Sequence, residues 1–90
     1  MNNTERMAAI RERIEAALDV HEIEVHDESH LHVGHAGAKD GRGHFSVRVV
    51  SPDFEGMTRL QRHQKIYEAM GELMASDIHA LRMRLVEPTT

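Results

Sequence analysis

The sequence predicts an α+β domain in which helices pack on one face of a small three-stranded mixed sheet. Two segments repeat apolar residues every three or four positions, which is typical of amphipathic helices. Three shorter segments alternate polar and apolar residues, as half-buried strands do. The 90 residues contain no internal repeat, no low-complexity stretch and no linker that would separate two domains. We therefore expect a single domain over residues 1–90, in the order helix, strand, strand, helix, strand.

The first helix is expected over about residues 3–18. Its apolar stripe consists of Met7, Ile10, Ile14, Ala17 and Leu18. Charged side chains fill the other faces, so one face should pack on the sheet. Asn3 or Thr4 is the expected N-cap, because a short polar side chain can accept hydrogen bonds from unpaired N–H groups of the first turn.

The first two strands are expected at about residues 22–26 and 44–50. The alternating apolar residues are Ile23 and Val25 in the first strand and Phe45, Val47 and Val49 in the second. A loop rich in glycine and histidine joins them, at about residues 30–43, and is too long for a tight hairpin. The two strands should pair antiparallel.

The second helix is expected over about residues 58–74, and the third strand over about residues 80–86. The predicted apolar stripe of the helix is Leu60, His63, Tyr67, Met70 and Met74. In the strand, apolar residues alternate with arginines. The helix can act as a right-handed crossover, which would place the third strand parallel to a neighbour.

Composition excludes several function classes. The chain has no cysteine, so disulfides, thiol catalysis and self-contained thiolate clusters are excluded. Its formal charge of −4 speaks against a generic basic nucleic-acid binder. No catalytic motif is present, and we expect no enzyme activity. Without a membrane-length apolar run or a secretion signal, the expected location is the cytoplasm.

Eight histidines are the unusual feature of the composition. His30, His32 and His35 lie in the glycine-rich loop, where they are either solvated or the ligands of a zinc-binding loop. His44 is interpreted as a structural residue at the start of a strand. His79 follows the second helix, and its role depends on whether the loop returns to it.

Several short motifs occur in order along the chain. They are Glu24-Val25-His26-Asp27-Glu28-Ser29, Gly34-His35-Ala36-Gly37, His44-Phe45-Ser46-Val47, Val49-Val50-Ser51, Phe54-Glu55-Gly56, Gln61-Arg62-His63 and Ile78-His79-Ala80-Leu81. Taken together they resemble the BolA family, and the resemblance covers essentially the whole chain. It implies an αββαβ fold related to the type II KH domain.

The resemblance also implies a function in iron–sulfur cluster trafficking or iron sensing. BolA-like proteins pair with monothiol glutaredoxins of the CGFS type, and the heterodimer holds a [2Fe–2S] cluster. The glutaredoxin and glutathione supply thiolates, and the BolA-like chain supplies histidine. Carried over to this sequence, the ligands are His79 and His35, with His32 as the alternative loop ligand. The free chain is expected to be a monomer or a weak homodimer.

A DNA-binding transcriptional regulator is the alternative that the resemblance implies. The phosphate contacts would then be Arg59, Arg62 and Lys65 on the second helix. His63 lies on the same helix and is interpreted as a packing residue. Gln64 stands where an arginine is common in the family, which thins this basic patch.

Overall fold

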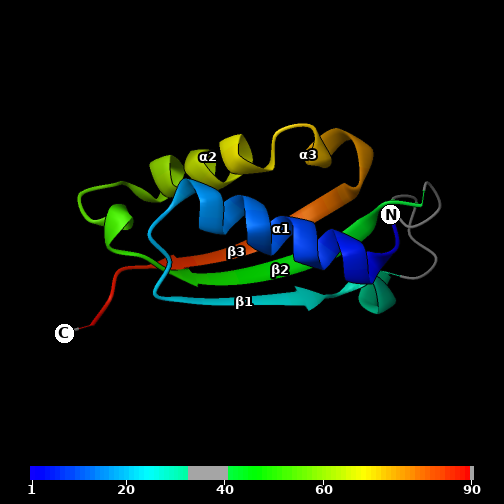
Figure 1. Cartoon of the computed structure of the whole chain (residues 1–90), viewed down its shortest axis with the longest axis horizontal. Coiled ribbons are helices and arrows are strands. Elements are labelled where there is room, and N and C mark those ends of the chain that lie inside the picture. The colour runs from blue at the N-terminus through cyan, green and yellow to red at the C-terminus, as the bar shows by residue number, and fades with distance from the viewer. Residues whose placement is uncertain (33–40, 90) are drawn as a thin grey trace.

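The elements follow the predicted order (Figure 1). The computed structural model of the chain describes residues 1–32 and 41–89. The helices are α1 (Asn3–Ala17), α2 (Arg59–Met70) and α3 (Leu73–Ser76), and the short 3₁₀ helices are η1 (Ser29–His32) and η3 (Pro52–Phe54). The strands are β1 (Glu22–Asp27), β2 (Gly43–Val50) and β3 (Ile78–Val86).

The three strands form a mixed sheet in the order β1-β2-β3. Strand β1 pairs antiparallel with β2, with Val25 opposite Val47. Strand β3 pairs parallel with β2, with Met83 opposite Val47. The α+β class and the mixed sheet are thus confirmed, as is the crossover through α2 that the parallel pairing requires.

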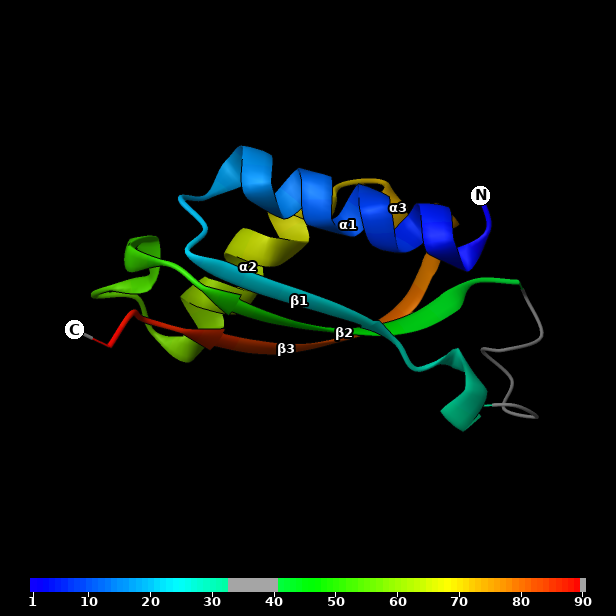
Figure 2. The ribbon, with the colours of Figure 1, turned by 60° about the horizontal axis from the view of Figure 1, so that its bottom comes forward.

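All three helices lie on one side of the sheet, as Figures 1 and 2 show. The core between the two layers consists of Ile10, Ile14, Leu18, Phe45, Val47, Val49, Phe54, Ile66, Met70, Leu73, Ile78 and Leu81. On the other face, Arg48 of β2 forms ion pairs with Glu24 and Glu22 of β1, at 3.1 and 3.7 Å. The apolar period of two therefore places the core on one side of the sheet and charge on the other.

Helix α1 begins one residue earlier than the expected cap allows. Asn2, rather than Asn3 or Thr4, is the N-cap: its side chain accepts the N–H of Glu5 at 2.8 Å, and the Glu5 carboxylate accepts the Asn2 N–H at 3.0 Å. This reciprocal pair is a capping box. Asn3 instead turns its side chain toward β1, where it donates a hydrogen bond to Asp27 at 3.1 Å.

The second predicted helix is two helices, and its predicted stripe is only partly right: Met70 is buried and Met74 packs against the core. Gly71 ends α2 in a left-handed backbone conformation (φ 55°), which glycine adopts without steric cost. The buried residues are Ile66, Met70 and Leu73, whereas Leu60 and Tyr67 are 66% and 43% exposed. Both sets have helical spacing, so the period alone does not identify the face that packs on the sheet.

Strand β3 begins at Ile78 and not at residue 80, so His79 lies within a strand rather than at the junction before it. The N-terminus, η1 and the first residues of β3 gather at one end of the sheet, and the C-terminus lies at the other end (Figures 1 and 2). Over the described part of the chain, no helix has the length and apolar character needed to cross a membrane.

Candidate functional site

Two histidines from neighbouring strands meet at the end of the sheet where β2 and β3 begin. The ring centroids of His44 and His79 are 4.9 Å apart, and the ring planes are inclined by 51°. His44 is 6% exposed, whereas the side chain of His79 reaches solvent. An irregularity in the parallel register explains the approach: Gly43 lies opposite Ile78 and His44 opposite Ala80, so His79 is an extra residue of β3 at this point.

A hydrogen-bonded network fixes the buried member of this pair. The hydroxyl of Ser29 accepts the backbone N–H of His44 at 3.1 Å, and the amide of Asn3 donates to the same hydroxyl at 3.2 Å. The backbone N–H of Glu28 also donates to the carbonyl of His44, at 2.7 Å. Residues of α1 and η1, and the residue between β1 and η1, therefore converge on the start of β2.

The carboxylate of Asp27 belongs to this network. Its partial burial alone would raise its pKa. The hydrogen bonds that it accepts from the backbone N–H and hydroxyl of Ser29 and from the side chain of Asn3 outweigh burial and hold the pKa below its ordinary value. Asp27 thus stays ionised and braces the turn from β1 into η1.

A second contact holds the start of β3. Arg6 of α1 donates from Nε to Asp77 at 3.0 Å, and both side chains are largely buried. Hydrogen bonds from Ser76 and Arg6 hold the pKa of Asp77 below its ordinary value. The backbone carbonyl of Asp77 accepts the N–H of Gly43 at 2.9 Å. The residues that precede His44 and His79 are therefore fixed to each other and to α1.

A hollow of about 420 Å³ opens beside His44. Its lining residues are Asn2, Asn3, Arg6, Ser29, His30, Gly41, Arg42 and His44. Arg42 also contacts the exposed histidine of the pair, with Nη2 3.0 Å from Nδ1 of His79. This end of the molecule thus combines an exposed imidazole on a rigid strand with an open, polar surface around it.

The two loop histidines predicted as ligands lie at or beyond the edge of the described residues. His35 lies outside the described residues, and the same holds for the side chain of His32, whose backbone forms the end of η1. His30 is exposed and borders the hollow. In residues 1–32 and 41–89, no three His, Cys, Asp or Glu side chains are grouped to hold a metal ion. The zinc-binding loop therefore stays a prediction, since it includes His35.

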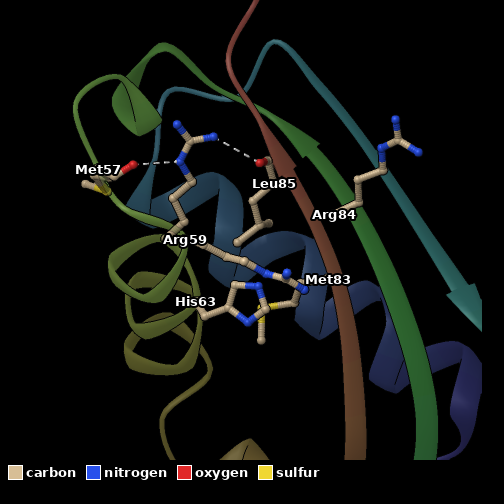
Figure 3. A pocket seen from close by; sticks show the side chains of 7 residues that line it. Met57, Arg59, His63, Met83, Arg84 and Leu85 are labelled. Atoms are coloured by element: carbon tan, nitrogen blue, oxygen red, sulfur yellow. Dashed lines mark hydrogen bonds between the residues drawn. The ribbon is translucent and has the colours of Figure 1, made fainter.

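A groove lies between α2 and the outer edge of β3 (Figure 3). It has a volume of about 310 Å³ and is lined by Met57, Arg59, Arg62, His63, Met83, Arg84 and Leu85. Arg59 reaches from α2 toward β3 above His63, and Arg84 extends from β3 away from α2. Among the described residues, neither Arg59 nor Arg84 has an acidic partner. The edge of β3 is therefore flanked by two uncompensated cations.

The three predicted phosphate contacts do not form one surface. Arg59 and Arg62 both line the groove, but Arg62 also donates to the carbonyls of Met57 and Leu85, each at 3.2 Å, and pairs with Glu87. Lys65 lines a different hollow, on another side of α2. Arg62 is thus a structural residue that ties α2 to β3. His63, interpreted as a packing residue, lines the groove instead.

Sequence reasoning missed two residues of these sites. His44 has a structural role in the sequence interpretation, although the parallel register brings it against His79. Arg84 belongs, by sequence, only to the polar half of an alternating strand. The register of the β2–β3 pair would have revealed the contact of His44 with His79. The position of Arg84 beside the groove becomes apparent only when β3 is known to lie at the edge of the sheet.

Comparisons with known structures agree with this architecture. The BolA domain of SufE1 from Arabidopsis thaliana superposes with a TM-score of 0.81 at 38% identity, over 92% of each chain. BolA1 from Mus musculus gives a TM-score of 0.75 at 43% identity, over 91% of this chain and 64% of that one. Both proteins share the fold of this chain.

Several curated proteins are similar to this chain in sequence. BolA-like protein 1 of Mus musculus is 43% identical over 81 residues, which are 90% of this chain and 57% of that protein. The DNA-binding transcriptional regulator BolA of Haemophilus influenzae is 35% identical over 79 residues, 88% of this chain and 74% of that protein. SufE-like protein 1 of Arabidopsis thaliana is 42% identical over 77 residues, 80% of this chain and 21% of that protein.

The chain spans about a fifth of the length of SufE-like protein 1, about three fifths of mouse BolA-like protein 1 and about three quarters of the Haemophilus protein. The family model described as BolA-like protein matches residues 14–90, which contain the whole sheet, α2 and both histidines of the pair. By sequence and by fold, the chain belongs to the BolA family.

Proposed function

We propose that this BolA-like chain is a non-catalytic accessory protein of iron–sulfur cluster trafficking or iron sensing. It would share a [2Fe–2S] cluster with a monothiol CGFS glutaredoxin and glutathione, using His79 and one loop histidine, His35 or His32, as ligands. The observation that carries the proposal is an exposed imidazole, His79, on a rigid strand beside a second histidine and an open hollow.

The donor set fits such a shared site. Imidazole is a suitable iron ligand, and a chain without cysteine can contribute no thiolate. Because the chain has no cysteine, the thiolates would come from the glutaredoxin and from glutathione. When bound, the cluster would supply one-electron chemistry, and histidine in place of thiolate raises its potential.

Each part of this chain has a distinct task in the proposal. His79 places an imidazole at the surface, and its backbone is fixed by the contact of Asp77 with Arg6. His44 packs against the ring of His79 and restricts its orientation. The hollow beside the pair leaves space for the partner's side chains.

The experiment mixes the purified chain with a cluster-loaded CGFS glutaredoxin and follows the visible circular dichroism spectrum and the particle size. We expect a new spectrum that saturates at a one-to-one ratio and is lost in His79→Ala. His35→Ala and His32→Ala identify the loop ligand. The control His21→Ala changes an exposed histidine of another surface and should leave the spectrum unchanged. An unaltered spectrum in the double variant His79→Ala/His35→Ala would contradict the proposal.

A nucleic-acid-binding regulator is the second candidate. One relative is named a DNA-binding transcriptional regulator, and the groove beside β3 offers uncompensated cations, Arg59 and Arg84, near an exposed aromatic side chain, Tyr67. Phosphates would contact the arginines, and the strand edge would set the direction of the nucleic acid. The salt dependence of oligonucleotide binding tests this candidate.

A further inference from the structure

The contact between Arg42 and His79 restricts what the histidine can do. Arg42 lies directly before β2, and its Nη2 is 3.0 Å from Nδ1 of His79. A guanidinium group carries donors only, so Nδ1 of His79 is the acceptor in this contact. The imidazole is accordingly assigned the tautomer that carries its proton on Nε2.

Neither ring nitrogen can bind a metal while this hydrogen bond exists. At Nδ1, the lone pair that a metal needs is engaged by Arg42. At Nε2, the lone pair becomes available only when the proton moves to Nδ1. That proton would then point at the N–H groups of Arg42, and two donors repel each other. Both routes therefore require the guanidinium to leave His79.

We infer that Arg42 is a latch that keeps His79 out of metal coordination until the partner complex displaces it. The inference rests on the proposed ligand role of His79 and extends it to a second residue. Arg42 is a positioning residue, because it acts through the histidine and makes no contact with the metal itself. The latch would disfavour uptake of stray metal ions by the free chain.

The expected size of the effect follows from the kind of contact. One exposed hydrogen bond from a charged donor competes with ligation, so its removal should tighten cluster binding by about threefold to tenfold. Arg42→Met removes the donor and keeps most of the side-chain length. Arg42→Lys keeps a charged donor and should restore part of the competition.

Arg82→Met is the matched control. Arg82 lies three residues after His79 on β3 and is a more exposed arginine, which pairs with Glu28 at 3.0 Å. Its replacement removes the same charge from the same end of the molecule but leaves the Arg42 contact in place. If Arg42 acted on the cluster only through its positive charge, Arg42→Met and Arg82→Met would change cluster binding in the same way.

Two measurements test the latch in the full chain. The first is the ¹⁵N chemical shifts of the His79 ring in the free chain, which report the tautomer. The second is the titration of each variant with the cluster-loaded glutaredoxin, followed by visible circular dichroism. We expect Arg42→Met to increase the Nδ1-protonated population and to tighten binding, while Arg82→Met matches the unmodified chain.

The latch would be refuted by Arg42→Met binding equally well or more weakly, or by unchanged ring shifts in that variant. This failure differs from a failure of the proposed function. If His79→Ala abolishes the mixed-complex spectrum while Arg42→Met has no effect, His79 is a ligand and the latch is wrong. If His79→Ala has no effect, the proposed function itself fails.

Discussion

Arg6 and Asp77 join the first turn of α1 to the residue before β3 by an ion pair of 3.0 Å in which the two side chains are only 13% and 14% exposed. The two residues are 71 positions apart in sequence, and Asp77 lies two residues before His79. Arg6 also donates to the side chain of Asn3 at 2.9 Å, and Asn3 donates to Asp27 and Ser29. A continuous polar network therefore supports both strands that carry the histidine pair.

We predict that Arg6→Met destabilises the chain clearly more than Arg82→Met. Both arginines pair with a carboxylate at 3.0 Å, but Arg82 is 77% exposed. A solvent-exposed pair contributes little, so Arg82→Met should cost at most about 0.5 kcal/mol. Loss of Arg6 leaves Asp77 without this partner in a mostly buried position. Urea unfolding measures the free energy of unfolding of each variant. Equal losses of stability would show that the burial of the Arg6 pair does not matter.

The two lowered aspartate pKa values predict a loss of stability in acid. Asp27 and Asp77 both have folded-state pKa values below their ordinary value of 3.8. Their contribution to stability is present above pH 3.8 and is lost as the pH falls through the lower folded-state values. Urea unfolding between pH 6 and pH 2.5 should show this decline, with a shallower slope in Asp27→Asn. An unchanged slope in that variant would contradict the assignment.

The class, order and pairing of the elements could be predicted from the sequence because they follow from local periods. The apolar period of two was enough for β1 and β2, whose inward residues are the predicted ones. The period of α2 was ambiguous, since the buried Ile66 and the exposed Tyr67 each belong to a row with helical spacing. Only packing against the sheet selects between such rows.

Gly43→Ala is predicted to disturb the histidine pair. A methyl group at Gly43 would overlap the ring of Phe45, which is 1% exposed and cannot move aside. Overpacking of this kind costs about 1–3 kcal/mol. The control Gly56→Ala meets no atom within 4 Å but sits at φ 76°, so it carries only a backbone cost of about 1–2 kcal/mol.

The two glycine variants separate strain at the site from a general decrease in stability. We expect Gly43→Ala to shift the NMR signals of the His44 and His79 rings, because Gly43 adjoins the bulge that sets their register. Gly56→Ala should leave those signals in place. Equal shifts in both variants would mean that the histidine pair responds to stability alone.

The histidine pair shows where prediction from sequence ended. His44 and His79 are 35 positions apart, and their contact depends on a parallel register with an irregularity between Gly43 and His44. No local pattern encodes that shift. The same holds for Arg62, whose two carbonyl acceptors come from a loop and from β3. The contact of the two histidines and the role of Arg62 both depend on segments that are far apart in sequence and meet only in the folded chain.

Substitutions of Arg59 and Arg84 should separate the second candidate function from the structural role of Arg62. Arg59→Gln/Arg84→Gln should weaken binding to a single-stranded oligonucleotide and lower its salt dependence, because binding releases about one counterion fewer for each phosphate that is no longer neutralised. Arg62→Gln should reduce the urea midpoint instead, since Arg62 joins α2 to β3 through Met57 and Leu85.

Fluorescence anisotropy over a range of salt concentrations measures the binding, with a duplex of the same sequence in a parallel series. Tighter binding of the single strand would fit a groove of about 310 Å³ that is flanked by cations and lies beside a strand edge. If the double variant binds like the unmodified chain while folded Arg62→Gln binds more weakly, then Arg62 contacts the nucleic acid. Arg59 and Arg84 would then not carry the binding, and the hydrogen bond of Arg62 to Leu85 of β3 would have to open for the phosphate.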